Sequence, residues 1–132
     1  MNTDEHGWNA LTERIISCVY NVSNELGCGF LENVYENAML VALRKAGLSA
    51  QSQVRFKVFY QGVDVGEYIA DVVVEGVVLL ELKAARALDS SHQAQLLNYL
   101  RATGIEVGLL LNFGPKPEFK RLVFDIYKRR VL

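Results

Sequence analysis

The sequence predicts an α/β fold in which helices flank a mixed β-sheet. Apolar residues recur at helical spacing near the N-terminus, and strand-like apolar runs follow in the middle of the chain. A further helical segment separates the third of these runs from the fourth. A helix between two strands implies a crossover connection, which places a parallel pair of strands inside an otherwise antiparallel sheet.

The first two elements are predicted to be helices. The first spans about residues 12–26, where the apolar side chains at helical spacing are Ile15, Ile16, Val19, Val22 and Leu26. The glycines of Gly27-Cys28-Gly29 end it, and a second helix is expected from about Leu31 to Ala46, before Gly47.

Three strands are predicted next, followed by a helix and two more strands. The strands span Val54–Tyr60, Val65–Val74 and Val77–Ala84. Ser90 and Gln93 fit a capping box for a helix that reaches about Thr103, where Gly104 ends it. The last strands are expected over Ile105–Phe113 and Phe119–Tyr127.

Length and composition indicate one domain with a sizeable core. The chain has 132 residues, of which 51% are hydrophobic. We expect an N-terminal tail over residues 1–10, a single domain over 11–127 and a basic tail over 128–132.

No apolar run approaches the ~18 residues of a membrane span, and the polar, acidic start is not typical of a signal peptide. Cys18 and Cys28 form no zinc pattern and suit a reducing, cytoplasmic setting.

Charge is nearly balanced, but it is unevenly distributed. The net charge is −1, whereas the segment from Lys116 onward carries +4 and the remainder −5. A basic end of this kind is compatible with phosphate contacts and equally with an ordinary solvated terminus.

The most informative feature is Asp71 followed by Glu81-Leu82-Lys83, with a hairpin turn predicted at Glu75-Gly76. Side chains alternate along a strand, so Glu81 and Lys83 share a face. A strict two-residue turn would pair Asp71 with Leu80, on the wrong face. We therefore expect an odd-length connection or a β-bulge, which would bring Asp71 opposite Glu81 or Lys83.

Charged side chains inside such apolar strands are costly to bury without compensation. Two carboxylates that share a divalent cation, with a lysine beside them, would supply it. The alternative is a buried ion pair between an acid and the lysine. Because buried ionic groups are rare, the pattern favours a metal site.

Two helical segments carry further candidate residues. In the second predicted helix, Glu32, Tyr35 and Glu36 share one face, and in the third, Gln95 and Tyr99 share another. Taken singly, each set is also typical of a solvated helix face.

Together these motifs resemble a known family. Gly29-x-x-Glu32-x-x-Tyr35 matches the signature of the GxxExxY family, and Asp71…Glu81-x-Lys83 matches the core of the PD-(D/E)XK nuclease superfamily, in which that family is placed. Gln95-x-x-x-Tyr99 is similar to a motif of the exonuclease-like branch of this superfamily. The resemblance extends from about Leu11 to Val123. Cys28 and Ala70 stand where the patterns have proline.

The resemblance implies a restriction-endonuclease-like core, with a mixed four-stranded sheet flanked by helices. It implies that Asp71, Glu81 and the Leu82 carbonyl ligate Mg²⁺ or Mn²⁺, and that Glu32 adds a ligand or holds a metal-bound water. Hard cations of this kind prefer oxygen ligands. Lys83 would orient the attacking water or neutralise charge on the phosphate. The substrate-positioning residues would be Gln95, Tyr99 and Tyr35.

The function implied is metal-dependent hydrolysis of phosphodiester bonds in DNA or RNA. The alternative is a non-catalytic module that retains the fold and binds nucleic acid or protein. A homodimer that reaches both strands of a substrate is a further possibility. A Rossmann-like phosphate site at Gly27-Cys28-Gly29 is disfavoured, because no strand precedes that turn.

Overall fold

The fold was analysed in a computed structural model that describes residues 8–125 and 130–131. Within these residues the chain forms three helices and six strands: α1 (Trp8–Leu26), α2 (Glu32–Lys45), β1 (Ala50–Tyr60), β2 (Val63–Val74), β3 (Val78–Lys83), α3 (Ser90–Thr103), β4 (Val107–Phe113), β5 (Pro117–Asp125) and β6 (Arg130–Val131). Most of both predicted tails, and the end of the last predicted strand at residues 126–127, lie outside the described residues.

The strands form one mixed sheet in the order β1-β2-β3-β4-β5-β6. β3 and β4 run parallel and are joined through α3, whereas the other neighbours are antiparallel. The predicted α/β fold and its crossover are thus confirmed. The sheet extends beyond the four-stranded core that the resemblance implies: β5, the fifth strand predicted from the sequence, adds to β4 with a regular antiparallel register, and β6 extends that edge.

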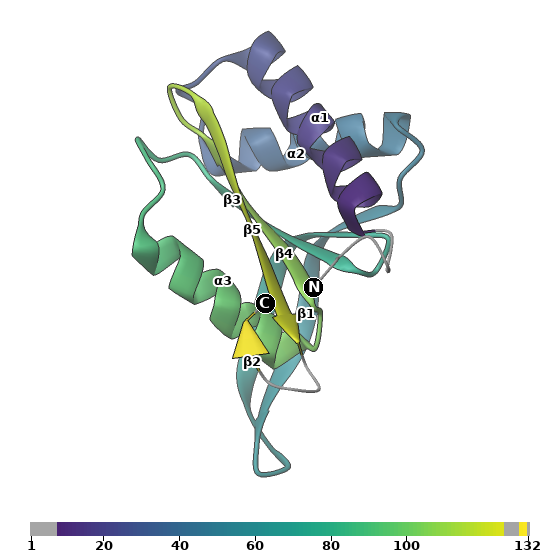
Figure 1. The fold of residues 1–132 in the computed structure, drawn as a ribbon, viewed down its shortest axis with the longest axis vertical. Coiled ribbons are helices and arrows are strands. Elements are labelled where there is room, and N and C mark those ends of the chain that lie inside the picture. The colour runs from purple at the N-terminus through teal and green to yellow at the C-terminus, as the bar shows by residue number, and fades with distance from the viewer. Residues whose placement is uncertain (1–7, 126–129, 132) are drawn as a thin grey trace.

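The helices form a layer on each side of the sheet (Figure 1). α1 and α2 pack against one another over one face, where Ile15, Tyr35 and Leu43 join Leu80 and Leu109 in the first apolar core. α3 covers the other face, where Leu96 and Leu100 pack with Leu79 and Leu110 in the second core. β3 and β4 contribute to both cores, which explains why their sequences are almost continuously apolar.

Several boundaries differ from the predicted ones. α1 begins at Trp8, four residues before the expected start. Asp89, not Ser90, is the N-cap of α3, because its carboxylate accepts hydrogen bonds from Ser91 N at 2.8 Å and His92 N at 3.3 Å. No helix within the described residues is both long enough and apolar enough to span a bilayer.

Candidate active site

A three-residue turn sets the register of the β2–β3 hairpin. Val74 pairs with Val78, so the connection consists of Glu75, Gly76 and Val77. Glu75 and Gly76 both adopt positive φ, 54° and 69°. Continuing the register beyond the pair Val72 and Leu80 places Asp71 opposite Glu81. The predicted odd-length connection is confirmed, and it brings the two acids together across neighbouring strands.

The regular alternation of β2 is interrupted next to Asp71. Ala70 packs in the core beneath α3, whereas Val72, two residues further, packs in the core beneath α1 and α2. In a regular strand these two side chains would share a face. Across the ladder, the position opposite Asp71 is occupied by Gln53, which has a φ of 52°. This irregularity places the Asp71 side chain over β3, where Oδ2 accepts a hydrogen bond from Leu82 N at 2.9 Å.

Asp71 opens into a small cavity beside α2. The cavity has a volume of about 270 Å³ and is lined by Glu32, Asn33, Glu36, Gln53, Asp71 and Leu82. Gln53 Nε2 donates a hydrogen bond to Glu36 Oε1 at 2.8 Å, which ties β1 to α2 at this point. The structure therefore brings the predicted residue Glu32 to the same cavity as Asp71.

Glu81 is buried on the α3 side of Asp71, with only 7% of its surface exposed. Its Oε1 accepts a hydrogen bond from the Tyr68 hydroxyl. The Tyr68 ring stacks on Tyr99 of α3, with the ring centroids 3.8 Å apart and the planes inclined by 16°. Tyr99 thus reaches the site only through the ring of Tyr68, and its expected role in positioning a substrate stays a prediction.

Lys83 lies at the end of β3 and points to α3. Its Nζ donates a hydrogen bond to Gln95 Oε1 at 3.2 Å. Gln95 and Tyr99 lie four residues apart on one helix. Gln95 contacts Lys83 directly. Tyr99 is linked to Glu81 through Tyr68. Gln95 is exposed, so it remains accessible next to Lys83.

The chain after Lys83 is fixed by β4. The side chain of Asn112, which is fully buried, accepts from Ala85 N at 2.9 Å and donates to the Ala85 carbonyl at 3.0 Å. Gly114 lies so close to this segment that an added Cβ would collide with the Ala85 carbonyl oxygen. These contacts determine how the strand carrying Lys83 leaves the sheet.

The acidic side chains of the site lie close together and are partly buried, and both conditions shift their pKa values. Burial, followed by the charge of Asp71, raises the pKa of Glu81 to about 7, although the hydrogen bond from Tyr68 and the charge of Lys83 oppose this. Burial also raises the pKa of Asp71, opposed by the Leu82 N–H and reinforced by the charge of Glu32. The pKa of Glu36 is raised mainly by burial as well. The local environment therefore disfavours negative charge on all three acids.

Tyr35 differs from its expected role. It is fully buried, stacks on Phe113 with ring centroids 4.6 Å apart, and donates its hydroxyl to the Gly27 carbonyl at 2.7 Å. A side chain enclosed in this way braces the α1–α2 turn and is not in a position to touch a substrate. The helical repeat placed Tyr35 beside Glu32, but three residues rotate a helix far enough for one side chain to enter the core while the other stays exposed.

Tyr68 and Gln53 were not singled out from the sequence, and Glu36 was noted beside Glu32 but received no role; all three contact or line the candidate site. Tyr68 precedes Asp71 by three residues, and in a regular strand it would face away from Asp71. Tyr68 and Asp71 can both reach Glu81 only because the alternation of side chains along β2 is interrupted between them. A signal was present for Glu36, which follows Glu32 by one helical turn.

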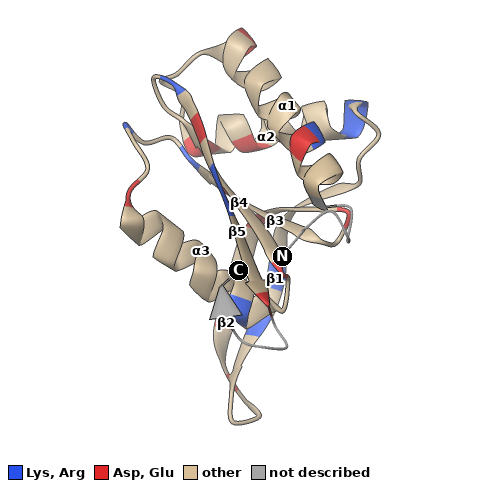
Figure 2. Ribbon diagram, in the orientation of Figure 1, with Lys and Arg blue, Asp and Glu red and all other residues tan. Residues whose placement is uncertain are grey.

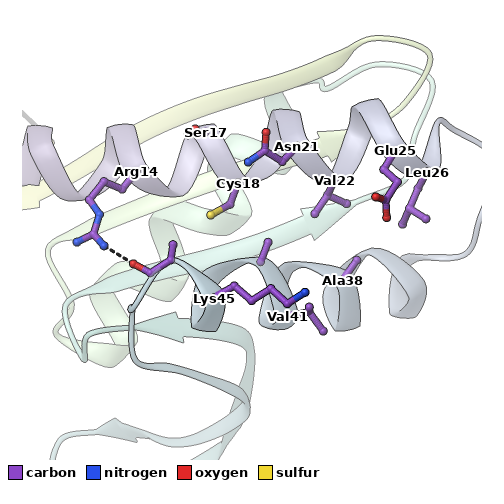
Figure 3. Close-up of a pocket in the computed structure, with 12 residues that line it drawn as sticks. Arg14, Ser17, Cys18, Asn21, Val22, Glu25, Leu26, Ala38, Val41 and Lys45 are labelled. Carbon is purple, nitrogen blue, oxygen red and sulfur yellow. Dashed lines mark hydrogen bonds between the residues drawn. The ribbon is translucent and has the colours of Figure 1, made fainter.

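A larger cavity lies away from these residues. It is a groove of about 780 Å³ between α1 and α2, and its lining includes the apolar or weakly polar Cys18, Val22 and Ala42 and the charged Arg14, Glu25 and Lys45 (Figure 3). None of the predicted site residues lines it. Its chemistry is that of a partly apolar surface groove, so we place the candidate active site at the smaller cavity.

Apart from Lys83, the basic residues of the described part of the chain do not gather around the site. They are spread over α1, the last turn of α2, β1, the β3–α3 loop, α3, the β4–β5 turn and β5 (Figure 2). Arg121 of β5 donates to the side chain of Asn9, and so is engaged with α1. Lys128 and Arg129 of the predicted basic tail lie outside the described residues.

Asp71 and Glu81 alone do not form a complete metal site. Over residues 8–125 and 130–131, no group of three or more His, Cys, Asp or Glu side chains is arranged to hold a metal ion. A cation between the two acids would therefore take further oxygen ligands from the backbone, water or substrate.

Fold and site together define a class of protein: an α/β domain in which a β-hairpin presents an aspartate opposite the glutamate of a Glu-x-Lys strand. A family model described as the PD-(D/E)XK nuclease superfamily matches residues 9–122. The chain belongs to this superfamily.

A solved structure described as "Crystal structure of SSO0001" is similar in fold, with a TM-score of 0.52 and 22% sequence identity. The similarity covers 86% of this chain and 57% of that chain, so this protein spans little more than half the length of that structure. At this identity the likeness concerns the fold alone. A search of curated proteins finds no significant match.

Proposed function

We propose that the protein is a metal-dependent phosphodiester hydrolase that acts on DNA or RNA. The observation that carries this proposal is the proximity of Asp71 to Glu81, since each carboxyl group acts on the pKa of the other, with Lys83 following on the same strand and hydrogen-bonded to Gln95. Membership of a nuclease superfamily supports the same reaction class. Within that superfamily we assign the chain to the GxxExxY family, on the motif Gly29-x-x-Glu32-x-x-Tyr35.

The residues present fit a divalent cation. Two neighbouring acids whose pKa values are raised by burial and by nearby negative charge are stabilised when a cation lies between them. Asp71, Glu81 and the Leu82 carbonyl would hold Mg²⁺ or Mn²⁺, and Glu32 would hold a water from the opposite side of the cavity. When bound, such an ion polarises the phosphate and lowers the pKa of water.

The other side chains have roles that follow from their contacts. The charge of Lys83 lowers the pKa of both Asp71 and Glu81, so its ammonium group lies close enough to the acids to neutralise charge that develops on the phosphate. Gln95 fixes the direction of the Lys83 ammonium through their hydrogen bond. Tyr99 supports Tyr68 and so the buried Glu81.

A cleavage panel tests this proposal. Purified protein is incubated with single- and double-stranded DNA and RNA in Mg²⁺, in Mn²⁺ and in EDTA. We expect cleavage that requires the metal and is reduced by ~10²–10⁴-fold in Lys83→Ala, with the circular dichroism spectrum unchanged. Exposed Lys57→Ala, on the distant β1–β2 hairpin, is the matched control and should cleave like the wild type.

If the wild type cleaves none of these substrates with either metal, or if Lys83→Ala cleaves equally well, the hydrolase proposal fails. Retained binding of nucleic acid without cleavage would then favour the non-catalytic module. Filter binding of the same substrates measures that property separately.

A further inference from the structure

The buried hydroxyl of Tyr68 is hydrogen-bonded to one of the two carboxylate oxygens of Glu81. It donates to Oε1, and both side chains are almost fully enclosed, Tyr68 at 9% and Glu81 at 7% exposure. This hydrogen bond holds the carboxylate in one orientation and favours binding of a cation through the other oxygen, Oε2.

The ring of Tyr68 has little freedom to move away. It stacks on Tyr99, with the ring centroids 3.8 Å apart, and on the ring of Phe56, with the centroids 6.3 Å apart. Withdrawal of the hydroxyl would leave a buried donor without an acceptor, which is unfavourable. Tyr68 is therefore a fixed group, and an incoming cation must accommodate it.

We propose that Tyr68 is a positioning residue that restricts Glu81 to binding a cation through one oxygen, and that it thereby favours Mg²⁺ and Mn²⁺ over Ca²⁺. The inference rests on the cation site of the proposed function and adds the basis of its ion selectivity. Sequence patterns assigned Glu81 as a ligand but gave no role to Tyr68.

The physical basis is the difference between the ions. Ca²⁺ takes six to eight oxygen ligands at ~2.3–2.6 Å and readily accepts both oxygens of one carboxylate. Mg²⁺ requires six ligands at ~2.0–2.1 Å, in near-octahedral geometry, and keeps several waters. A glutamate limited to one oxygen satisfies the smaller ion and deprives Ca²⁺ of a ligand.

The test is cation binding without substrate. Mn²⁺ binding is followed by electron paramagnetic resonance, and Mg²⁺ and Ca²⁺ are titrated as competitors against wild type, Tyr68→Phe and Tyr99→Phe. Tyr68→Phe removes the hydroxyl and keeps the stacked ring. Tyr99→Phe is the matched control, because it removes a hydroxyl from the same stack and leaves Tyr68 in place. Asp71→Ala shows which part of the signal comes from this site.

We expect Tyr68→Phe to raise the affinity for Ca²⁺ relative to Mg²⁺ by about tenfold, the effect of one hydrogen bond of ordinary net strength, and Tyr99→Phe to leave the ratio unchanged. An unchanged ratio in Tyr68→Phe, or an equal change in Tyr99→Phe, overturns the inference. A crystal structure of the wild type with Mn²⁺ provides a test without a variant: Glu81 should ligate through one oxygen, and chelation through both would overturn the inference.

The two proposals fail separately. If the ratio changes as expected but no nucleic acid is cleaved, the selectivity role stands and the hydrolase function falls. If cleavage occurs but the ratio does not respond to Tyr68, the reverse holds. Absence of Mn²⁺ binding at Asp71 overturns both.

Discussion

The ammonium of Lys83 donates a hydrogen bond to the side-chain oxygen of Gln95, 3.2 Å away on α3. This contact joins the strand that carries the catalytic candidates to the helix that covers it. It also predicts that substitutions of Gln95 and Lys83 reduce cleavage to different extents.

Gln95→Ala should reduce cleavage less than Lys83→Ala, because it removes the support of the ammonium and not the charge. We expect a loss of about tenfold for Gln95→Ala, against ~10²–10⁴-fold for Lys83→Ala. Single-turnover rates in Mn²⁺ measure both. Asn98→Ala, at an exposed amide on the same helix, serves as the control. A larger loss for Gln95→Ala than for Lys83→Ala would contradict the assignment.

Stability of the metal-free protein should decrease as the pH rises through neutrality. The pKa of Glu81 is raised from 4.5 to about 7 in the folded protein, so the folded chain binds more protons than the unfolded chain between these values. The contribution to stability is full below the lower value and is lost above the upper one. It amounts to at most about 3 kcal/mol.

Urea unfolding in EDTA at about pH 5 and about pH 8 measures this pH effect. Glu81→Gln should reduce the difference between the two conditions. Part of it should remain, because the pKa values of Asp71 and Glu36 are raised in the same direction. An identical pH dependence in wild type and Glu81→Gln would show that Glu81 is not the group responsible.

Divalent cations should raise the melting temperature of the wild type and not that of Asp71→Ala. A ligand at a hundred times its dissociation constant stabilises the folded state by about 2.7 kcal/mol. Thermal melts with Mn²⁺, with Mg²⁺ and with EDTA give the comparison. Glu67→Ala removes an exposed acid from the same strand and should keep the response to metal. An equal rise in Asp71→Ala would locate the ion elsewhere.

Gly114→Ala should destabilise the protein by about 1–3 kcal/mol, because the added Cβ meets a backbone oxygen that cannot rotate away. Gly108→Ala should cost less, since its Cβ would lie 2.9 Å from the end of the Leu96 side chain, which can adjust. Gly66→Ala, whose Cβ would meet nothing within 4 Å, is the control. Urea unfolding ranks the three, and equal values for Gly114→Ala and Gly66→Ala would refute the close approach.

Tyr35→Phe separates a structural role from a substrate-binding one. The change removes the hydrogen bond donated to the Gly27 carbonyl and the one accepted from Phe30 N, and it keeps the stack on Phe113. We expect a loss of about 1 kcal/mol of stability and an unchanged KM. A raised KM at full stability would return Tyr35 to the substrate-positioning residues.

The meeting of Asp71 with either Glu81 or Lys83 could be predicted, because side chains alternate along a strand and the number of residues in the turn decides which faces meet. A two-residue turn put the acids on opposite faces, so the need for another residue in the turn followed from counting. The crossover between β3 and β4 was equally accessible, because a helical segment between two apolar strands leaves few topologies.

The contacts around Glu81 could not be predicted, because they depend on a local interruption in the alternation of side chains along β2. Gln53 adopts positive φ with no sequence signal such as glycine, and the alternation of β2 changes beside it. Tyr68 reaches Glu81 only because of this break. The burial of Tyr35 similarly depends on how α2 rotates against the sheet, a tertiary property that the Gly29-x-x-Glu32-x-x-Tyr35 spacing does not contain.

The three-residue turn between β2 and β3 also has a kinetic consequence. Hairpins close in about 1–10 μs, well before contacts between distant segments can form. The two acids should therefore meet early in folding, while water still surrounds them and screens their repulsion. Their dehydration comes later, when α2 and α3 dock on opposite sides of the hairpin. A divalent cation present during refolding should thus accelerate this late docking step and leave hairpin closure unchanged.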